Sequence, residues 1–81
     1  MSVAKTVELR IGSVYLVPQS YGGYERAEIA DIQADLIRVE FQWSISGWLK
    51  GADFIKRDPV LLGHYEQRGF WPFARRELVR A

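Results

Sequence analysis

The strongest constraint on the fold is a strict alternation of apolar and polar residues that begins after Leu36. Ile37, Val39, Phe41 and Trp43 are apolar, and the residue between each pair of them is charged or carries an amide. A period of two over seven positions is typical of a β-strand with one buried face. The stretch therefore predicts a strand that runs as far as Trp43 and places these four side chains on one face.

The preceding segment, YERAEIADI over residues 24–32, predicts the partner strand of a β-hairpin. The turn between the two strands would lie within Asp31–Asp35. One antiparallel register pairs opposite charges twice, Glu28 with Arg38 and Arg26 with Glu40. Each such pair would stabilise the hairpin by roughly 0.2–1 kcal/mol.

Further strands are expected on both sides of this hairpin. Val7–Val17 predicts a first strand that bends at Gly12, and Pro18 ends it because proline cannot donate to the ladder. Trp48–Ala52 predicts a fourth strand, and Asp53–Arg57 predicts a 3₁₀ turn with a short fifth strand. Five short strands with no long helical pattern between them predict a mainly β fold, either a small barrel or a sandwich.

The C-terminal part of the chain has a different pattern. Asp58-Pro59 is a favoured start for a helix, so we expect a short helix over Val60–Arg68. An aromatic cluster over 70–73 follows, and the remaining residues predict one or two helical turns. We therefore expect a barrel over residues 1–57 and a helical, aromatic C-terminal extension over 58–81 that packs on it.

The chain length and the absence of cysteine exclude several classes of protein. An 81-residue chain predicts one domain, and without cysteine it has no disulfide, thiolate metal site or cysteine nucleophile. A secreted domain this small would usually need disulfides, so we expect a cytoplasmic protein. The first ten residues lack the apolar run of a signal peptide, and no stretch approaches the roughly 20 apolar residues of a membrane span. We therefore expect no membrane contact.

No motif in the chain predicts catalysis. His64 is the only histidine, and no carboxylates lie at ligand spacing around it. The nucleophile elbow, the P-loop and the zinc-protease motif are all absent. We therefore expect a protein that is not an enzyme and that uses no cofactor and no metal.

Four segments resemble the SH3-like small barrels, and within them the Tudor-type domains. They are LRIGSVYLV as the opening strand, YERAEIADI and LIRVEFQ as the next two strands, and GADFIKR as the closing turn with the last strand. The resemblance covers roughly residues 7–57. It implies a small five-stranded SH3-like barrel, to which the expected helical extension is added.

Tudor-type domains bind methylated lysine or arginine in a cage of aromatic rings. Tyr24 and Phe41 match cage positions of that family. Leu9 stands where the family often has an aromatic residue, and Ser44 and Ile45 replace a common Tyr-Gly pair. The resemblance thus implies a peptide-binding site that contains Tyr24 and Phe41.

Aromatic residues near the strand ends predict a binding surface without reference to any family. Loops at one end of a barrel converge, and rings gathered there can attract cations, stack on bases or form the centre of a protein interface. The alternative is that the rings fill a small core. We predict a protein or peptide partner, with the carboxylate of Glu25 pairing with a basic group, and a homo-oligomer is one possible form. The predicted site consists of Tyr21, Tyr24, Glu25, Phe41, Trp43 and Trp48.

The distribution of charge leaves a second kind of partner open. The net charge is +1, but residues 1–55 carry −2 and residues 56–81 carry +3. Arginine interleaved with aromatic residues suits single-stranded nucleic acid, which is bound by phosphate contacts and base stacking. The residues for this alternative are Trp71, Arg75, Arg76 and Arg80. A third possibility is that the aromatic tail docks on a second subunit.

Overall fold

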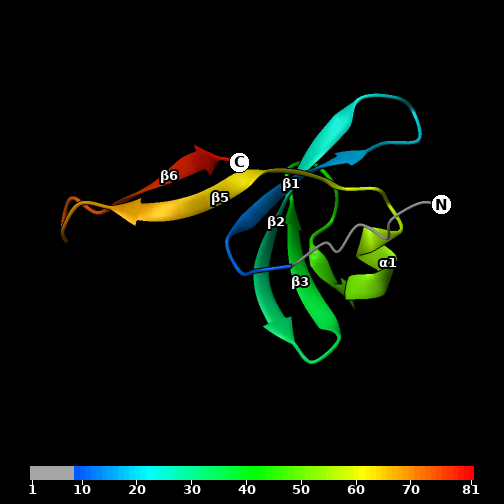
Figure 1. The fold of residues 1–81 in the computed structure, drawn as a ribbon, viewed down its shortest axis with the longest axis horizontal. Helices are drawn as coiled ribbons and strands as arrows, with labels where there is room; N and C mark the ends of the chain where they lie inside the picture. The colour runs from blue at the N-terminus through cyan, green and yellow to red at the C-terminus, as the bar shows by residue number, and fades with distance from the viewer. Residues whose placement is uncertain (1–8) are drawn as a thin grey trace.

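The described part of the chain forms one antiparallel sheet of six strands with one short helix, so the fold is mainly β. The computed structural model describes residues 9–81. The elements in chain order are β1 (Ser13–Pro18), β2 (Tyr24–Gln33), β3 (Leu36–Phe41), β4 (Gly47–Lys50), α1 (Gly51–Ile55), β5 (Val60–Arg68) and β6 (Arg75–Arg80). The sheet order is β4-β3-β2-β1-β5-β6, so within these residues β4 and β6 are edges and the sheet is not closed (Figure 1).

The predicted hairpin is present as β2 and β3, joined by a two-residue turn at 34–35. The register differs from the predicted one, because Glu28 lies opposite Glu40 and Asp31 lies opposite Arg38. Both predicted pairs of opposite charge across this hairpin are therefore wrong. The position of the tight turn fixes the pairing, and a bulge in the middle of β2 shifts it by one further residue.

The first and fourth strands are shorter than predicted. β1 begins at Ser13, after a turn in which Gly12 has a φ of +91° that favours glycine. Pro18 ends it as predicted. The start of the predicted strand, at Val7, lies outside the described residues. β4 ends at Lys50, where α1 follows directly.

The core lies between the strands and α1, on the face that β2 and β3 turn inward. Phe54 in α1 has no exposed surface, and its ring meets Tyr15 edge-on with the ring centres 5.5 Å apart. The short fifth strand predicted together with a 3₁₀ turn over Asp53–Arg57 is wrong, because the segment forms the end of the helical turn α1, which carries Phe54 inward. The buried cluster consists of Tyr15, Val17, Ala27, Ile29, Ile37, Val39 and Phe54.

The predicted helix over residues 60–68 is wrong, and so are the predicted helical turns after residue 74. These segments are β5 and β6, and β5 pairs with β1 from Val60 to His64. The proposed helix start fails because Asp58 has a φ of +55°. Gly63 permits the strand pairing, since a Cβ on it would lie 2.1 Å from the carbonyl oxygen of Val79. Residues 58–81 thus supply one inner strand and one edge strand of the same sheet.

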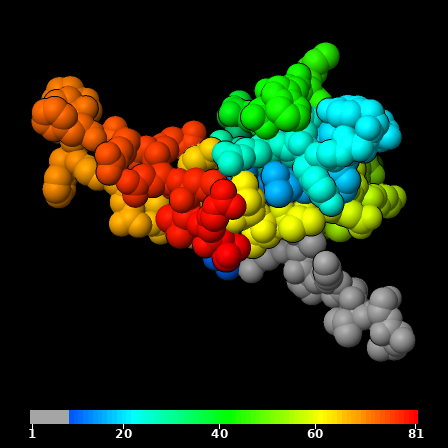
Figure 2. Space-filling model, turned by 90° about the horizontal axis from the view of Figure 1, so that it is seen from above, coloured from blue at the N-terminus to red at the C-terminus, as the bar shows by residue number. Residues whose placement is uncertain are grey.

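Beyond its pairing with β1, the β5–β6 hairpin leaves the body of the molecule. We call residues 66–77 the arm. Within the described chain it is a two-stranded ribbon with no third strand beside it. Figures 1 and 2 show it projecting from the sheet, and the Cα extents of 48 × 28 × 24 Å reflect this elongation. None of the described helices is long and apolar enough to cross a membrane.

Candidate functional site

Large apolar side chains are exposed at the end of the sheet where the loop after β1 and the loop after β3 meet. We call Tyr21, Tyr24, Trp43 and Ile45 the loop surface. Their exposed fractions are 76%, 56%, 68% and 95%, in that order. The two segments that carry them lie side by side in Figure 2, in cyan and in green. Within the described residues none of these rings stacks on another ring, and each ring residue is more than half exposed.

The loop of residues 42–46 is held against β2 by the carboxylate of Glu25. Its Oε2 accepts hydrogen bonds from the backbone N–H groups of Trp43 at 2.5 Å and Ser44 at 2.6 Å, and its Oε1 accepts one from Ser44 Oγ at 2.7 Å. The residue is 1% exposed. A charged carboxylate buried in this way is tolerated because hydrogen bonds from the loop satisfy it. Glu25 therefore fixes the backbone from which Trp43 projects.

The ionisation of Glu25 follows from the same contacts. Burial alone would raise the pKa of the carboxyl, but the hydrogen bonds from the Ser44 hydroxyl, the Ser44 N–H and the Trp43 N–H outweigh it. The net effect holds the pKa of Glu25 below its ordinary value. The group is therefore charged throughout the neutral range, and its hydrogen bonds to the loop are intact there.

The loop should be released at acid pH. Because the pKa of Glu25 is lower in the folded chain than in the unfolded one, its stabilisation is complete above the ordinary value of about 4.3 and is lost as the pH falls through the folded-state pKa. Trp43 fluorescence and the Trp43 and Ser44 amide resonances should report a transition with a midpoint below the ordinary value for a glutamate. A Glu25→Gln variant should lack it, and a midpoint above the ordinary value would contradict the assignment.

The β1–β2 loop is also ordered by the backbone. Gln19 N–H donates to the carbonyl of Gly23 at 3.0 Å, and Gly22 N–H donates to the carbonyl of Gln19 at the same distance. Gly22 and Gly23 have φ values of +92° and +79°, which a side chain would strain. This tight turn presents Tyr21 at the loop apex.

The remaining predicted binding residues lie elsewhere. Phe41 lies opposite Ala27 on the core face, where it packs against the edge of the core with the guanidinium of Arg57 5.8 Å from its ring centre. Trp48 lies on β4, directly opposite Arg38, and is 45% exposed. The predicted role of Glu25 as a partner for an external basic group does not fit the structure, because its carboxylate is buried and bonded to the loop.

The sequence contained a signal for the burial of Glu25. Ala27 and Ile29 face the core, and the same period of two extends back to Glu25. A charged residue on the core face of a strand predicts a buried acceptor with partners. The partners themselves lie 18 and 19 residues away, so no local pattern could identify them.

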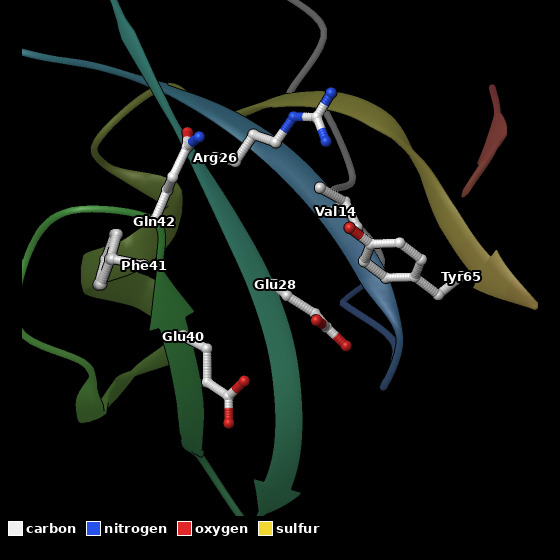
Figure 3. Close-up of a pocket in the computed structure, with 7 residues that line it drawn as sticks. All are labelled: Val14, Arg26, Glu28, Glu40, Phe41, Gln42 and Tyr65. Atoms are coloured by element: carbon white, nitrogen blue, oxygen red, sulfur yellow. The ribbon is translucent and has the colours of Figure 1, made fainter. Parts of the chain in front are cut away.

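A groove of about 290 Å³ lies on the opposite face of the sheet, at the base of the arm. Its side chains come from β1, β2, β3 and β5, together with Gln42 after β3 (Figure 3). Glu28 and Glu40, which are directly opposed in the ladder, extend from neighbouring strands on one side of it. The lining residues are Val14, Arg26, Glu28, Glu40, Phe41, Gln42 and Tyr65.

The arm carries three of the residues that the sequence assigned to nucleic acid, and the fourth, Arg80, lies on β6 beyond it. Trp71 is 89% exposed at its tip. Arg75 pairs with Glu77 at 2.9 Å, and Arg76 pairs with Glu28 and lies over the Tyr65 ring, 4.1 Å from its centre. Arg80 makes no ion pair with any residue of the described chain. Two of the three arginines are thus already paired with carboxylates.

Among residues 9–81, no three carboxylate or histidine side chains gather closely enough to hold a metal ion. His64, on β5 rather than on a helix, lies at the surface with its Nε2 3.3 Å from the Glu66 carboxylate. Comparison of the chain with models of protein families, with curated proteins and with solved structures finds no match. The site must therefore be read from its own chemistry.

Proposed function

We propose that the chain is a non-enzymatic binding module, a small SH3-like barrel with an arm, that recognises a protein or peptide partner at the loop surface. The observation that carries the proposal is the buried Glu25 carboxylate, which bonds the loop at Trp43 and Ser44. The strand order, with the short helix between β4 and β5, supports the SH3-like part of the proposal.

The loop presents apolar side chains on an ordered backbone. A carboxylate and three hydrogen bonds order a loop whose apolar side chains, Trp43 and Ile45, are 68% and 95% exposed. Exposed apolar side chains on an ordered backbone add no stability to the isolated chain, because they remain in contact with water. In a complex they bury large area at low entropic cost, because the backbone is already in place.

Protein is a better match than single-stranded nucleic acid. Nucleic-acid affinity comes mainly from unpaired cations that neutralise phosphates. Arg75 and Arg76 already pair with carboxylates, and they lie on β6 rather than at the loop surface. An aromatic surface with few free cations is typical of protein recognition.

The test begins with selection of peptides from a random library against the immobilised chain, followed by calorimetric titration of the best binder. Trp43→Ala should weaken that binding about tenfold or more, as expected for a ring at the centre of an interface. Leu36→Ala, an exposed apolar position at the opposite end of the hairpin, is the control and should have little effect. An oligothymidine titrated in parallel tests for binding of single-stranded nucleic acid.

Two outcomes would contradict the proposal. One is selected peptides whose affinity is the same for the Trp43→Ala variant and the wild type. The other is tighter binding of the oligothymidine that falls steeply as salt is added, which would assign the chain to single-stranded nucleic acid.

A further inference from the structure

Both segments that carry the loop surface are without charged side chains. Residues 18–24 and 42–48 contain no aspartate, glutamate, lysine, arginine or histidine, whereas charged residues make up 26% of the whole chain. The surface of a soluble domain is normally about 25–35% charged. Two neighbouring segments that both lack charge therefore form one neutral surface, although they are distant in the sequence.

The carboxylate that follows the first of these segments is used inside the molecule. Glu25 is 1% exposed, and its two oxygens accept hydrogen bonds from the Trp43 N–H, the Ser44 N–H and the Ser44 hydroxyl. A buried carboxylate with these partners presents no charge to a ligand. The loop surface therefore has no anion from this residue that would select a basic group.

Two arginines close to the second segment are directed away from the loop surface. Arg26 accepts a backbone hydrogen bond from the Gln42 N–H at 3.0 Å, but its side chain lines the groove on the face of the sheet (Figure 3). The guanidinium of Arg57 lies 5.8 Å from the centre of the Phe41 ring, at the edge of the core. Neither guanidinium belongs to the loop surface.

The polar side chains of the two segments bond to the chain itself. Gln19 Nε2 donates to a carbonyl oxygen of β1 at 3.1 Å, and Ser44 Oγ donates to Glu25 at 2.7 Å. Ser46 Oγ accepts from the backbone N–H of Phe41 at 3.0 Å. These hydrogen bonds order the loops, and the side chains presented outward are the three rings and Ile45. A ligand that needs many hydrogen bonds, such as a sugar, is therefore a poorer match than an apolar one.

An apolar, uncharged surface of this kind discriminates against charge. A charged group buried against it loses its water without gaining a partner, which costs several kcal/mol. The attraction of a cation to the face of an exposed ring is only about 0.5–1 kcal/mol, so it does not offset that cost. An apolar side chain instead gains about 25 cal/mol for each Å² removed from water.

We propose that the partner of the loop surface is a protein segment whose contacting side chains are large, apolar and uncharged. This inference rests on the proposed function and names the chemistry of the partner. Methylated lysine and arginine, which the resemblance to Tudor-type domains implies, do not fit it, because they are cations and the buried Glu25 carboxylate is closed to them.

A charge placed on the loop surface tests the neutrality of the partner. The probe is the end-capped peptide of highest affinity selected from a random library, and calorimetry measures its dissociation constant for Ile45→Lys and Ile45→Glu. Ile45 is 95% exposed, so both variants should fold, which circular dichroism checks. Both should bind about tenfold more weakly, and their constants should agree within about threefold, because burying either sign against an uncharged partner costs a similar amount.

The matched controls carry the same charges at the opposite end of the hairpin. Leu36 is 39% exposed, and Leu36→Lys and Leu36→Glu should each change the dissociation constant by less than about twofold. Added salt gives a second readout. The affinity of the wild type should change by less than about twofold between low and high salt, because no ion pair is screened.

Opposite effects of the two Ile45 variants would overturn the inference. Tighter binding by Ile45→Glu would identify a cationic partner, and tighter binding by Ile45→Lys an anionic one. In both cases Trp43→Ala would still weaken the binding, so peptide recognition at the loop surface would stand. Peptides that bind Trp43→Ala as tightly as the wild type would instead contradict the proposed function itself.

Two further measurements separate a protein segment from other occupants of the loop surface. Light scattering on the full chain should give the same mass for Trp43→Ala and the wild type, and the wild type should not sediment with phosphatidylcholine vesicles. A dimer that dissociates on Trp43→Ala would assign the surface to a second copy. Vesicle binding that is lost on Trp43→Ala would assign it to a membrane. Either result would overturn the inference.

Discussion

Replacing Phe54 with alanine should lower the free energy of unfolding by about 3–5 kcal/mol, the range for deleting a fully buried phenylalanine. The side chain has no exposed surface and meets the Tyr15 ring edge-on. An 81-residue domain has a total stability of the order of 5–15 kcal/mol, so this loss is a large part of it. Chemical denaturation followed by far-UV circular dichroism measures the change.

The matched control is the next residue of the same helix. Ile55 is 37% exposed, and Ile55→Ala should cost less than about 1 kcal/mol. Similar losses for the two variants would mean that α1 does not carry the core contact. A small loss for Phe54→Ala would mean that the sheet closes its core in some other way.

Replacing Glu25 with glutamine should release the loop of residues 42–46. Glutamine keeps the shape but removes the charge, so a neutral amide oxygen must accept from the Trp43 and Ser44 N–H groups and the Ser44 hydroxyl must become an acceptor, which weakens the charge-assisted hydrogen bonds that hold the loop. The amide protons of Trp43 and Ser44 should then exchange with solvent more than about tenfold faster than in the wild type. Hydrogen exchange read by NMR measures this, and the affinity for a selected peptide should fall with it.

A second glutamate provides the control for this variant. Glu66 is exposed on the arm and pairs with Arg68 at 2.9 Å. Glu66→Gln should leave exchange at Trp43 and Ser44 unchanged. If Glu25→Gln also left these two amides protected, the loop would be ordered by other contacts, and the role assigned to Glu25 would be wrong.

The local sequence pattern predicted those strands in which buried and exposed side chains alternate. The period of two identified β2 and β3, and it placed Ile37 and Val39 on the core face, where both are buried. It failed at Trp43, because β3 ends at Phe41 and the chain turns outward there. The aromatic residue that closes the core is Phe54, which reaches it from a single helical turn with no repeating pattern.

The C-terminal strands could not be predicted from their own residues. Asp58-Pro59 is a favoured helix start, but pairing of β5 with β1 and β6 overrides that preference. Gly63, which weakens a helix, is the residue that lets β6 pass close to β5. The same holds for the candidate site. The exposure of its rings could be predicted from their positions in loops. The contact of Glu25 with Ser44 could not, because it depends on the folded arrangement of two distant segments.

The most direct test of peptide binding at the loop surface is a map of amide chemical shifts for the ¹⁵N-labelled chain as a selected peptide is added. We expect shifts concentrated at residues 21–25 and 42–45, with the aromatic cluster at residues 70–73 unchanged. The same titration of the Glu25→Gln variant should show weaker binding at the same residues. Shifts concentrated at the aromatic cluster or in the groove, with the loop surface unchanged, would contradict the central claim that Glu25 orders this loop for a protein partner.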